Sequence, residues 1–347
     1  MPNASLPSGA GSPFPRFSRS PDGAPNGAAS IVDVLEAVAL QATRAAALAC
    51  QAWHGRGDAN AADGAATDAM REALAHAPGG GEIVSGEGEK DDAPMLAGGE
   101  LVGTGDGPRF DVAVDPLECT SLLANGLPGA LATIAISEAG CMWRPGPSHY
   151  VEKLVVGPAA RDAIDITASP ERNLAAVAEA LCKPISEMRV VVLDKPRHAE
   201  LVAVLRAAGA SVCTPSAGDV AGSLAALLPD GDADVLMGVG GTPEGLMTAC
   251  AVRALGGGMQ VRLAPQRPAE RDALRAAGME DTAPLSLDQL VWGESAFFAT
   301  GVSGGSLLRR PWFQGGEQLT ESLIVAAGEA RRLVGVAEPQ LTSPFTV

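Results

Sequence analysis

Residues 111–131, DVAVDPLECTSLLANGLPGAL, contain the pattern around which the chain is organised. Phe110 and the next four residues include small and β-branched apolar side chains, which predict a short buried strand. Asp115, Pro116 and Glu118 follow in one turn, and small residues that favour a helix come next. Pro116 restricts the backbone of Asp115 to extended geometry, so this carboxylate should leave the strand end in a defined direction.

This turn suits a hard cation and a phosphate. Two carboxylates three residues apart can bind a divalent ion, and free backbone N–H groups at a helix start can bind phosphate. A capped turn on an acidic surface is the alternative. From Glu82 to Glu118 the chain has ten acidic and two basic residues, many of them near glycines. Like charges on such turns would repel one another without a cation, which favours a metal site.

Composition limits the possible functions. The 347 residues suffice for two domains or one large one. A net charge of −16 and 3% aromatic residues argue against nucleic-acid binding. The sequence shows no apolar run of the roughly 18 residues that span a bilayer and no secretion-signal core. The six cysteines lack C-x-x-C spacing, so we expect a cytoplasmic protein with reduced, mostly buried thiols and no membrane partner.

The first half of the chain combines helices with short strands. Residues 1–29 are rich in Pro, Gly, Ser, Ala and Asn, and we interpret them as a disordered extension. Helical spacing then runs from Ser30, the expected N-cap, to about Trp53. A second helix is predicted over 65–77 with Asp63 as its N-cap, a position from which a carboxylate can also reach a metal. Further strands are expected at 83–84, 131–136 and 154–156.

From about residue 188 the pattern becomes strand, loop and helix, three times over. This alternation is typical of a parallel sheet with functional groups at the C-terminal strand ends. The glycines at 238, 240 and 241 do not complete a dinucleotide-binding pattern, because Pro243 stands at its last position. Thr242 and Pro243 are instead predicted as the N-cap and first residue of a helix. Strands are also expected at 296–300 and 320–325, with a basic, polar end after them, whereas 263–290 is hard to place.

The polar residues at the ends of these elements point to phosphate-ester chemistry. Five carboxylates have hard-cation character, Asp91 and Thr120 lie beside them in the sequence, and Lys195 and Arg197 form a separate basic pair. Mg²⁺ or Mn²⁺ held by carboxylates can acidify water and bind phosphoryl oxygens. No P-loop or kinase motif is present, which favours hydrolysis over transfer from a nucleotide. The five carboxylates are Asp63, Glu87, Asp115, Glu118 and Glu244.

Six ordered motifs resemble the class II fructose-1,6-bisphosphatases of the lithium-sensitive sugar phosphatase superfamily, over about residues 31–335. The resemblance implies an α/β protein with the layered α-β-α-β-α sugar phosphatase fold and two stacked sheet domains. The expected division is an N-terminal metal-binding α+β domain at 30–187 and a C-terminal α/β domain at 188–338. The motifs are DGAA (63–66), GEGEKDDAPML (86–96), DPLE (115–118), YVEKL (150–154), KPRH (195–198) and GGTPEG (240–245).

The resemblance also implies a role for each matching residue. The five carboxylates above would bind Mg²⁺ or Mn²⁺, and Asp91 with Thr120 would position and deprotonate the attacking water. The substrate would be a small sugar phosphate, and a homo-oligomer is expected. The implied substrate-binding residues are Glu118, Cys119, Thr120, Tyr150, Lys195, Arg197 and Asp219.

Three positions depart from the family pattern, which usually has Lys at Ala59, Asp at Ala217 and Gly at Cys119. The region after Arg262 is also shorter than usual. Fructose 1,6-bisphosphate hydrolysis in gluconeogenesis or a carbon-fixation cycle is the first hypothesis. Another substrate, such as sedoheptulose bisphosphate, and a catalytically silent sugar-phosphate-binding paralogue are the alternatives. Cys119 is expected to be either a reactive thiol of lowered pKa or a small buried side chain in the place of a glycine.

Overall fold

A computed structural model describes residues 29–86, 96–279 and 283–337. From Ile31 onward the described residues belong to one compact unit. The extension predicted at 1–29, apart from its last residue, lies outside these ranges. The predicted site residues Glu87 and Asp91 also lie outside them.

The first sheet has eight strands, seven of them in the order β12-β13-β11-β4-β3-β1-β2. The eighth, β14, pairs with β13 on the edge opposite β11. Strand β3 runs parallel to β1 and antiparallel to β4. Both β4 and β11 are buried almost throughout, as their continuous runs of apolar and small residues require. The strands are β1 (Gly80–Ser85), β2 (Leu101–Val102), β3 (Arg109–Glu118), β4 (Leu131–Glu138), β11 (Ser295–Gly301), β12 (Trp312–Gln314), β13 (Glu317–Ala326) and β14 (Glu329–Val336).

The second sheet has six strands in the order β10-β9-β5-β8-β6-β7. Strands β6, β7 and β8 are parallel, as the alternating pattern predicted, but β5 is antiparallel to both β8 and β9. The parallel pairing predicted for these three strands is therefore confirmed. The sheet as a whole is mixed, because β5 enters from an earlier part of the chain and separates β8 from β9. The strands are β5 (Tyr150–Val156), β6 (Arg189–Val191), β7 (Ser211–Cys213), β8 (Val235–Gly241), β9 (Gly258–Leu263) and β10 (Leu285–Ser286).

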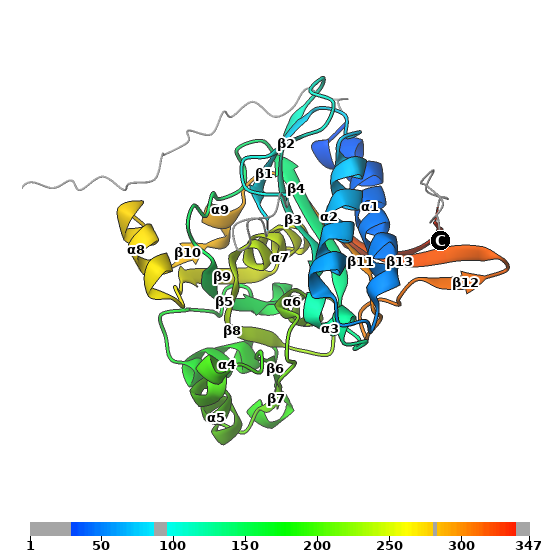
Figure 1. Ribbon diagram of the computed structural model, residues 1–347. Coiled ribbons are helices and arrows are strands. Elements are labelled where there is room, and N and C mark those ends of the chain that lie inside the picture. The colour runs from blue at the N-terminus through cyan, green and yellow to red at the C-terminus, as the bar shows by residue number, and fades with distance from the viewer. Residues whose placement is uncertain (1–28, 87–95, 280–282, 338–347) are drawn as a thin grey trace, which may run out of the picture. The chain divides into compact units, whose positions relative to one another are not determined.

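Helices cover both faces of each sheet, which gives the predicted α-β-α-β-α order of layers (Figure 1). Helices α1 (Ile31–Ala49) and α2 (Ala59–Leu74) pack on the outer face of the first sheet. Helices α6 (Asp219–Leu227) and α7 (Thr242–Leu255) lie between the sheets, with α7 contacting both. The outer layer on the second sheet contains α4 (Pro170–Ala180) and α5 (Ala199–Ala207).

These five layers pack against one another through three hydrophobic clusters. Strand β11 shows how one strand serves two of them: Phe298 joins the cluster under α1, and Phe297 joins the cluster around α7. Alternate side chains point to opposite faces of a strand, so adjacent phenylalanines enter different cores. The remaining helices are α3 (Thr120–Ala124), α8 (Pro268–Ala276), α9 (Leu287–Leu290) and the 3₁₀ turns Cys50–Trp53, Pro158–Ala160, Ile185–Glu187 and Pro196–His198.

Several element boundaries differ from the sequence-based expectations. Helix α2 begins at Ala59, and its N-cap is Asp58, which accepts a hydrogen bond from the backbone N–H of Ala61, so Asp63 is not the cap. The N-cap of α7 is Gly241, and Thr242, the predicted N-cap, is the first residue of the helix. The basic, polar end includes strand β14, in which Arg331 binds Glu36 of α1.

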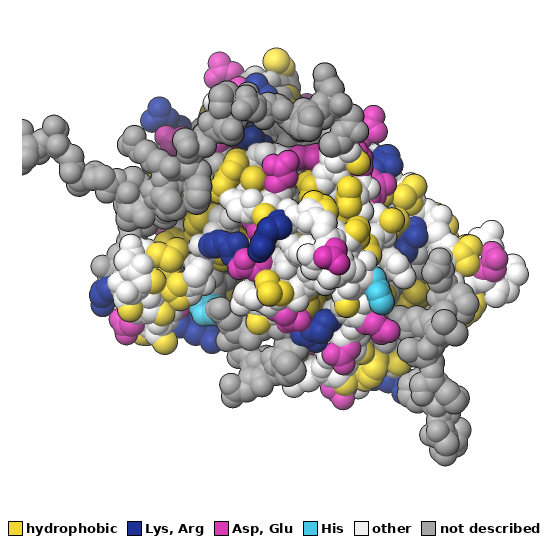
Figure 2. All heavy atoms as spheres, turned by 90° about the horizontal axis from the view of Figure 1, so that it is seen from above, with side chains coloured by type: hydrophobic (Ala, Val, Ile, Leu, Met, Phe, Trp, Pro, Cys, Tyr) yellow, Lys and Arg dark blue, Asp and Glu magenta, His cyan; other side chains and the backbone are white. Residues whose placement is uncertain are grey.

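The sheets do not divide the chain at residue 188. Strand β5 already belongs to the second sheet, and β11–β14 return to the first. The proposed two-domain division stays a prediction. Within the described ranges, no helix is both long enough and apolar enough to cross a bilayer. On the face in Figure 2, the described acidic and basic side chains are interspersed with apolar ones and form no continuous basic stripe.

Candidate active site

The junction of β3 and α3 brings Asp115 and Glu118 into the interior. Strand β3 continues through Pro116 to Glu118, and its pairing with β4 shifts between the two carboxylates. A proline cannot donate to the ladder, so an irregularity is expected at this position. Asp115 and Glu118 are both buried, and Asp115 Oδ1 accepts a 3.1 Å hydrogen bond from the backbone N–H of Leu117. The turn therefore presents two carboxylates where solvent does not stabilise their charges.

Asp63 reaches this turn from α2. Thr120 Oγ1 lies 2.8 Å from Asp63 Oδ1 and 3.0 Å from the carbonyl oxygen of Leu117. Asp63 is in the interior of the helix, where its side chain faces α3 rather than capping its own helix. The structure thus brings together two predicted site residues that are 57 positions apart.

The paired glycines at the end of β8 make room for two further carboxylates. A Cβ atom added at Gly240 would lie 1.9 Å from Asp219 Oδ2, and one at Gly241 would lie 1.9 Å from Glu244 Oε2. Non-bonded heavy atoms do not approach this closely, so the observed side-chain positions require glycine at both places. The two glycines of the motif at 240–245 therefore make the space that the carboxylates of Asp219 and Glu244 occupy.

Lys153 is a site residue that the sequence analysis did not assign. It projects from β5, is 1% exposed, and forms an ion pair with Asp219. Its Nζ also donates to the carbonyl oxygen of Gly241 at 3.1 Å. The signal in the sequence is that Lys153 alternates with Val151 and Val155, so all three side chains lie on the same, buried face of the strand. Lys153 compensates the charge of Asp219, and its ion pair joins β5 to α6.

Burial and neighbouring charges act strongly on Glu118. Burial raises the pKa of its carboxyl well above the ordinary value, and the charges of Asp219 and Glu244 raise it further. The N–H of Val220, 3.3 Å from Glu118 Oε1, and the more distant Lys153 oppose this shift. Glu118 Oε2 is buried and has no hydrogen-bond partner among the described residues.

These residues fit a hard divalent cation by their chemistry. Carboxylate oxygens are the donors that Mg²⁺ and Mn²⁺ prefer, and a buried oxygen without a partner suits a ligand atom. Within the described ranges, no three Asp, Glu, His or Cys side chains converge closely enough to form a complete metal site. The predicted ligand Glu87 falls outside those ranges, as does Asp91.

Cys119 adopts a left-handed conformation, with φ 65° and ψ 44°. Glycine enters this region without the penalty that a Cβ atom brings, which gives a physical reason for the glycine of the family pattern. Burial raises the pKa of the Cys119 thiol, and the charges of Glu118, Asp115 and other carboxylates add to the shift. The raised pKa favours the alternative of an inert side chain in the place of a glycine, and a reactive thiol beside bound cations stays a prediction.

A second group of predicted site residues lies on the second sheet. The guanidinium of Arg197 stacks over the ring of Tyr150, 5.5 Å from its centroid. Arg197 also donates to the carbonyl oxygen of Val239 on β8, at 2.8 Å from Nη2. Lys195 is half-buried at the start of the same 3₁₀ turn. The structure thus places Tyr150 and Arg197 together, and a guanidinium beside an aromatic ring is chemically able to bind an anionic ligand.

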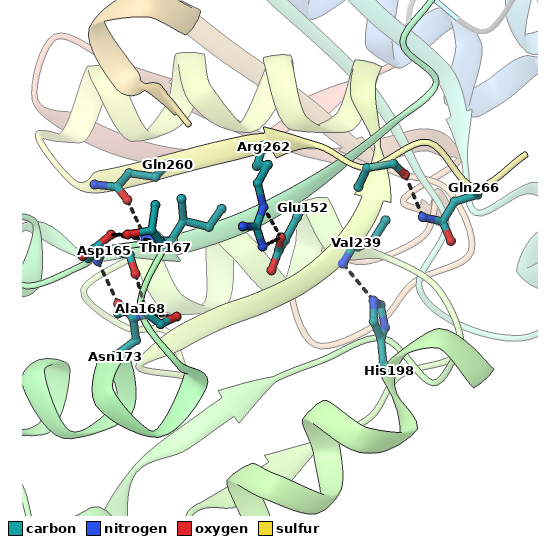
Figure 3. Close-up of polar contacts among 12 residues, drawn as sticks. Glu152, Asp165, Thr167, Ala168, Asn173, His198, Val239, Gln260, Arg262 and Gln266 are labelled. Atoms are coloured by element: carbon teal, nitrogen blue, oxygen red, sulfur yellow. Dashed lines mark hydrogen bonds and ion pairs between the residues drawn. The ribbon is translucent and has the colours of Figure 1, made fainter. Parts of the chain in front are cut away.

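His198 fixes this turn on β8. Its Nε2 accepts a 2.8 Å hydrogen bond from the N–H of Val239 (Figure 3). Its Nδ1 lies 2.8 Å from the carbonyl oxygen of Leu193. This pair of bonds requires the proton on Nδ1. Arg197 and His198 therefore bind the carbonyl and the N–H of the same residue, Val239, which sets the position of Arg197.

Comparisons with known proteins give the family. The family described as "Bacterial fructose-1,6-bisphosphatase, glpX-encoded" matches residues 34–336. The chain belongs to this family. It is 42% identical over 305 residues to fructose-1,6-bisphosphatase 1 class 2 of Escherichia coli K12, covering 84% of this chain and 90% of that protein. The identity and coverage are the same for fructose-1,6-bisphosphatase class 2 of Escherichia coli O6:H1 and of Shigella flexneri.

Membership of the class 2 fructose-1,6-bisphosphatase family confirms the resemblance drawn from the six motifs. It also makes this chain an enzyme of the phosphatase type. The roles of the individual residues stay predictions. The contacts and electrostatic effects described above connect seven of the predicted site residues: Asp63, Asp115, Glu118, Cys119, Thr120, Asp219 and Glu244. Tyr150, at the start of β5, and Arg197, in the turn Pro196–His198, form a separate stacked pair.

Proposed function

We propose that this chain hydrolyses fructose 1,6-bisphosphate to fructose 6-phosphate and phosphate with the help of Mg²⁺ or Mn²⁺. The observation that carries the proposal is the match to the class 2 fructose-1,6-bisphosphatases along nearly the whole described chain. The buried carboxylate cluster around Glu118 supports it, because such a cluster needs positive charge that Lys153 alone does not supply.

The metal would be held by Asp63, Asp115, Glu118 and Glu244, together with Glu87. Such an ion supplies positive charge to the phosphate and makes water more acidic. The Thr120 hydroxyl, fixed between Asp63 and the carbonyl of Leu117, would orient the attacking water, and Asp91 would accept its proton. Glu118 and Cys119 line the turn at which the reacting phosphate would bind.

Lys195, Arg197 and Tyr150 would hold the sugar and its distal phosphate. Arg197 is exposed, and its guanidinium is directed by both Val239 and the ring of Tyr150. Asp219 would contribute less directly than the exposed Arg197, because Asp219 is buried and paired with Lys153. This arrangement separates the groups that bind the distal part of the substrate from those that act on the reacting phosphate.

A second candidate substrate is another sugar bisphosphate, such as sedoheptulose 1,7-bisphosphate. The specific observation in its favour is Ala59, the first residue of α2, where the family pattern has a lysine close to the metal ligands. Loss of this cation could cost about 2–4 kcal/mol of transition-state stabilisation for the usual substrate. A silent sugar-phosphate-binding paralogue is disfavoured, because all five ligand carboxylates are kept in the sequence.

The direct test is phosphate release from a panel of sugar phosphates with Mg²⁺ and with Mn²⁺. The proposal predicts the highest kcat/KM with fructose 1,6-bisphosphate, and faster hydrolysis of the seven-carbon bisphosphate would select the alternative. We further propose that the enzyme is cytoplasmic and serves gluconeogenesis or a carbon-fixation cycle. Its six cysteines, all in the described part of the chain, are free thiols, which supports a reducing compartment. We also propose a homo-oligomer, which gel filtration with light scattering would test.

A further inference from the structure

The carboxylate of Glu270 holds the start of strand β5. Oε1 accepts hydrogen bonds from the backbone N–H of His149 at 2.8 Å and of Tyr150 at 3.0 Å. Oε2 accepts a third, 2.9 Å bond from the N–H of Gln266. The residue is 4% exposed, so these bonds are made in the interior, where hydrogen bonds to a carboxylate are strong.

This carboxylate completes the pairing of β5 at the point where β9 ends. Strand β9 ends at Leu263, opposite Val151, and only the N–H of Ala264 continues the contact by donating to the Tyr150 carbonyl at 3.0 Å. Glu270 Oε1 is the acceptor for the Tyr150 N–H beyond that point. On the other side, the N–H of Thr242 donates to the His149 carbonyl at 3.0 Å. His149 and Tyr150 are therefore each held through both the backbone N–H and the carbonyl group.

Glu270 also determines how α8 is attached. It lies in the first turn of the helix, where a carboxylate suits the helix dipole, and it binds the N–H of Gln266 just before the helix. Glu270 and Leu274 are the buried residues of α8. One side chain thus connects the helix, the segment that follows β9 and the first residue of β5.

The residue so fixed is Tyr150, whose ring lies under the guanidinium of Arg197. Arg197 is positioned independently from β8, through the carbonyl of Val239. The stacked pair therefore depends on two anchors: Val239 for the arginine and Glu270 for the tyrosine backbone.

We propose that Glu270 is a positioning residue of the sugar-phosphate site: it fixes Tyr150 so that the ring and Arg197 form one binding surface. The inference rests on the proposed function, in which Tyr150 contacts the substrate. Glu270 touches neither substrate nor reacting phosphate. It should therefore affect substrate binding more than the chemical step.

The test uses Glu270→Ala, the milder Glu270→Gln, Tyr150→Ala and the double variant of Tyr150→Ala with Glu270→Ala. Asp234→Asn is the matched control, because Asp234 is also a buried carboxylate of the second sheet that accepts a backbone N–H, from Arg189 at 2.8 Å. It precedes β8, at the end opposite the site. Readouts are KM and kcat with fructose 1,6-bisphosphate, Kd for fructose 6-phosphate by calorimetry, and Tm.

We expect Glu270→Ala to raise KM and Kd about tenfold and to change kcat by less than about twofold. Glu270→Gln, which keeps one acceptor oxygen, should give a smaller rise. Asp234→Asn should lower Tm without changing KM. In the Tyr150→Ala background, Glu270→Ala should change Kd by less than about twofold, because its effect passes through Tyr150.

Equal effects of Glu270→Ala on Kd in the two backgrounds would overturn the inference, and so would an unchanged Kd with a Tm loss like that of Asp234→Asn. If Glu270→Ala does not fold, the same criteria apply to Glu270→Gln. A wild type that binds fructose 6-phosphate but hydrolyses no sugar bisphosphate would refute the proposed function, while Kd still decides the inference. A wild type that does not bind fructose 6-phosphate would overturn the inference as well.

Discussion

Thr120 Oγ1 lies 2.8 Å from Asp63 Oδ1 and thereby joins the start of α3 to the interior of α2. The two residues belong to separate motifs of the sequence, and the fold places them at one end of β3. Their contact fixes the hydroxyl beside the carboxylate turn that carries Asp115 and Glu118.

Replacing Thr120 by Val should lower kcat by about 10²-fold, because valine keeps the shape but loses the hydroxyl that we assign to water orientation. Thr120→Ser retains the hydroxyl and should keep most of the activity. Steady-state kinetics of both variants, with circular dichroism to verify folding, gives the comparison. Normal kcat in Thr120→Val would remove Thr120 from the catalytic group.

Replacing Gly241 by Ala should reduce activity far more than stability. The added Cβ would clash with Glu244 Oε2, which is the end of a flexible side chain, so Glu244 can move away and leave its ligand position. Gly80→Ala is the matched control, since a Cβ at Gly80 has no described atom within 4 Å. We expect Tm shifts of a few degrees at most in both variants and a loss of kcat only in Gly241→Ala. Equal kcat values would show that the position of Glu244 does not matter.

The raised pKa of Glu118 predicts a pH-dependent stability. The folded protein favours the protonated carboxyl, whereas the unfolded chain titrates near the ordinary glutamate pKa of about 4.3. The unfolded state therefore binds fewer protons between these pKa values, and the contribution of Glu118 to stability is lost as pH rises through the folded pKa. Each unit of pKa elevation corresponds to about 1.4 kcal/mol.

Urea unfolding in EDTA measures this effect. Glu118→Gln should gain stability relative to the wild type as pH increases from about 5 to 8, because glutamine carries no charge at any pH. Adding Mn²⁺ should stabilise the wild type more than the variant, since the ion compensates the Glu118 charge. A stability difference that is constant with pH would mean that Glu118 keeps an ordinary pKa in the folded state.

Alkylation should follow exposure rather than proximity to the phosphate-binding turn. Cys182 and Cys213 are exposed, whereas burial and neighbouring carboxylates raise the pKa of the Cys119 thiol. Iodoacetamide should label Cys182 and Cys213 first, as peptide mass spectrometry will show, and should inactivate the wild type and Cys119→Gly at the same rate. Protection of the wild type alone by substrate would restore the hypothesis of a reactive Cys119.

The strands and the central turn were predicted because their signals are local, whereas the layered fold was implied by the resemblance to the family. Buried apolar runs mark β3, β4 and β11, and the glycine and proline positions mark the turns that carry Asp115 and Glu244. The position of Asp63 was recognised, although its role as an N-cap was wrong, because Asp58, five residues earlier, caps the helix instead.

The features that the sequence analysis did not predict depend on contacts between distant segments of the chain. Strand β14 is an edge strand exposed along most of its length, so it lacks the alternating pattern of a half-buried strand. The antiparallel insertion of β5 between β8 and β9 leaves no mark in its own residues. Glu270 is recognisable only when the fold brings the backbone of Tyr150 to it, and the partner of Lys153, Asp219, is likewise known only from the fold.

The central claim, that the carboxylate cluster around Glu118 hydrolyses fructose 1,6-bisphosphate with a divalent cation, is tested most directly by phosphate release from wild type and Glu118→Gln. Each protein is dialysed against EDTA and then assayed with and without added Mn²⁺. We predict no release by the wild type in EDTA, restored release with Mn²⁺, and kcat at least about 10²-fold lower in Glu118→Gln. Full activity of the wild type in EDTA, or of Glu118→Gln with Mn²⁺, would contradict the account.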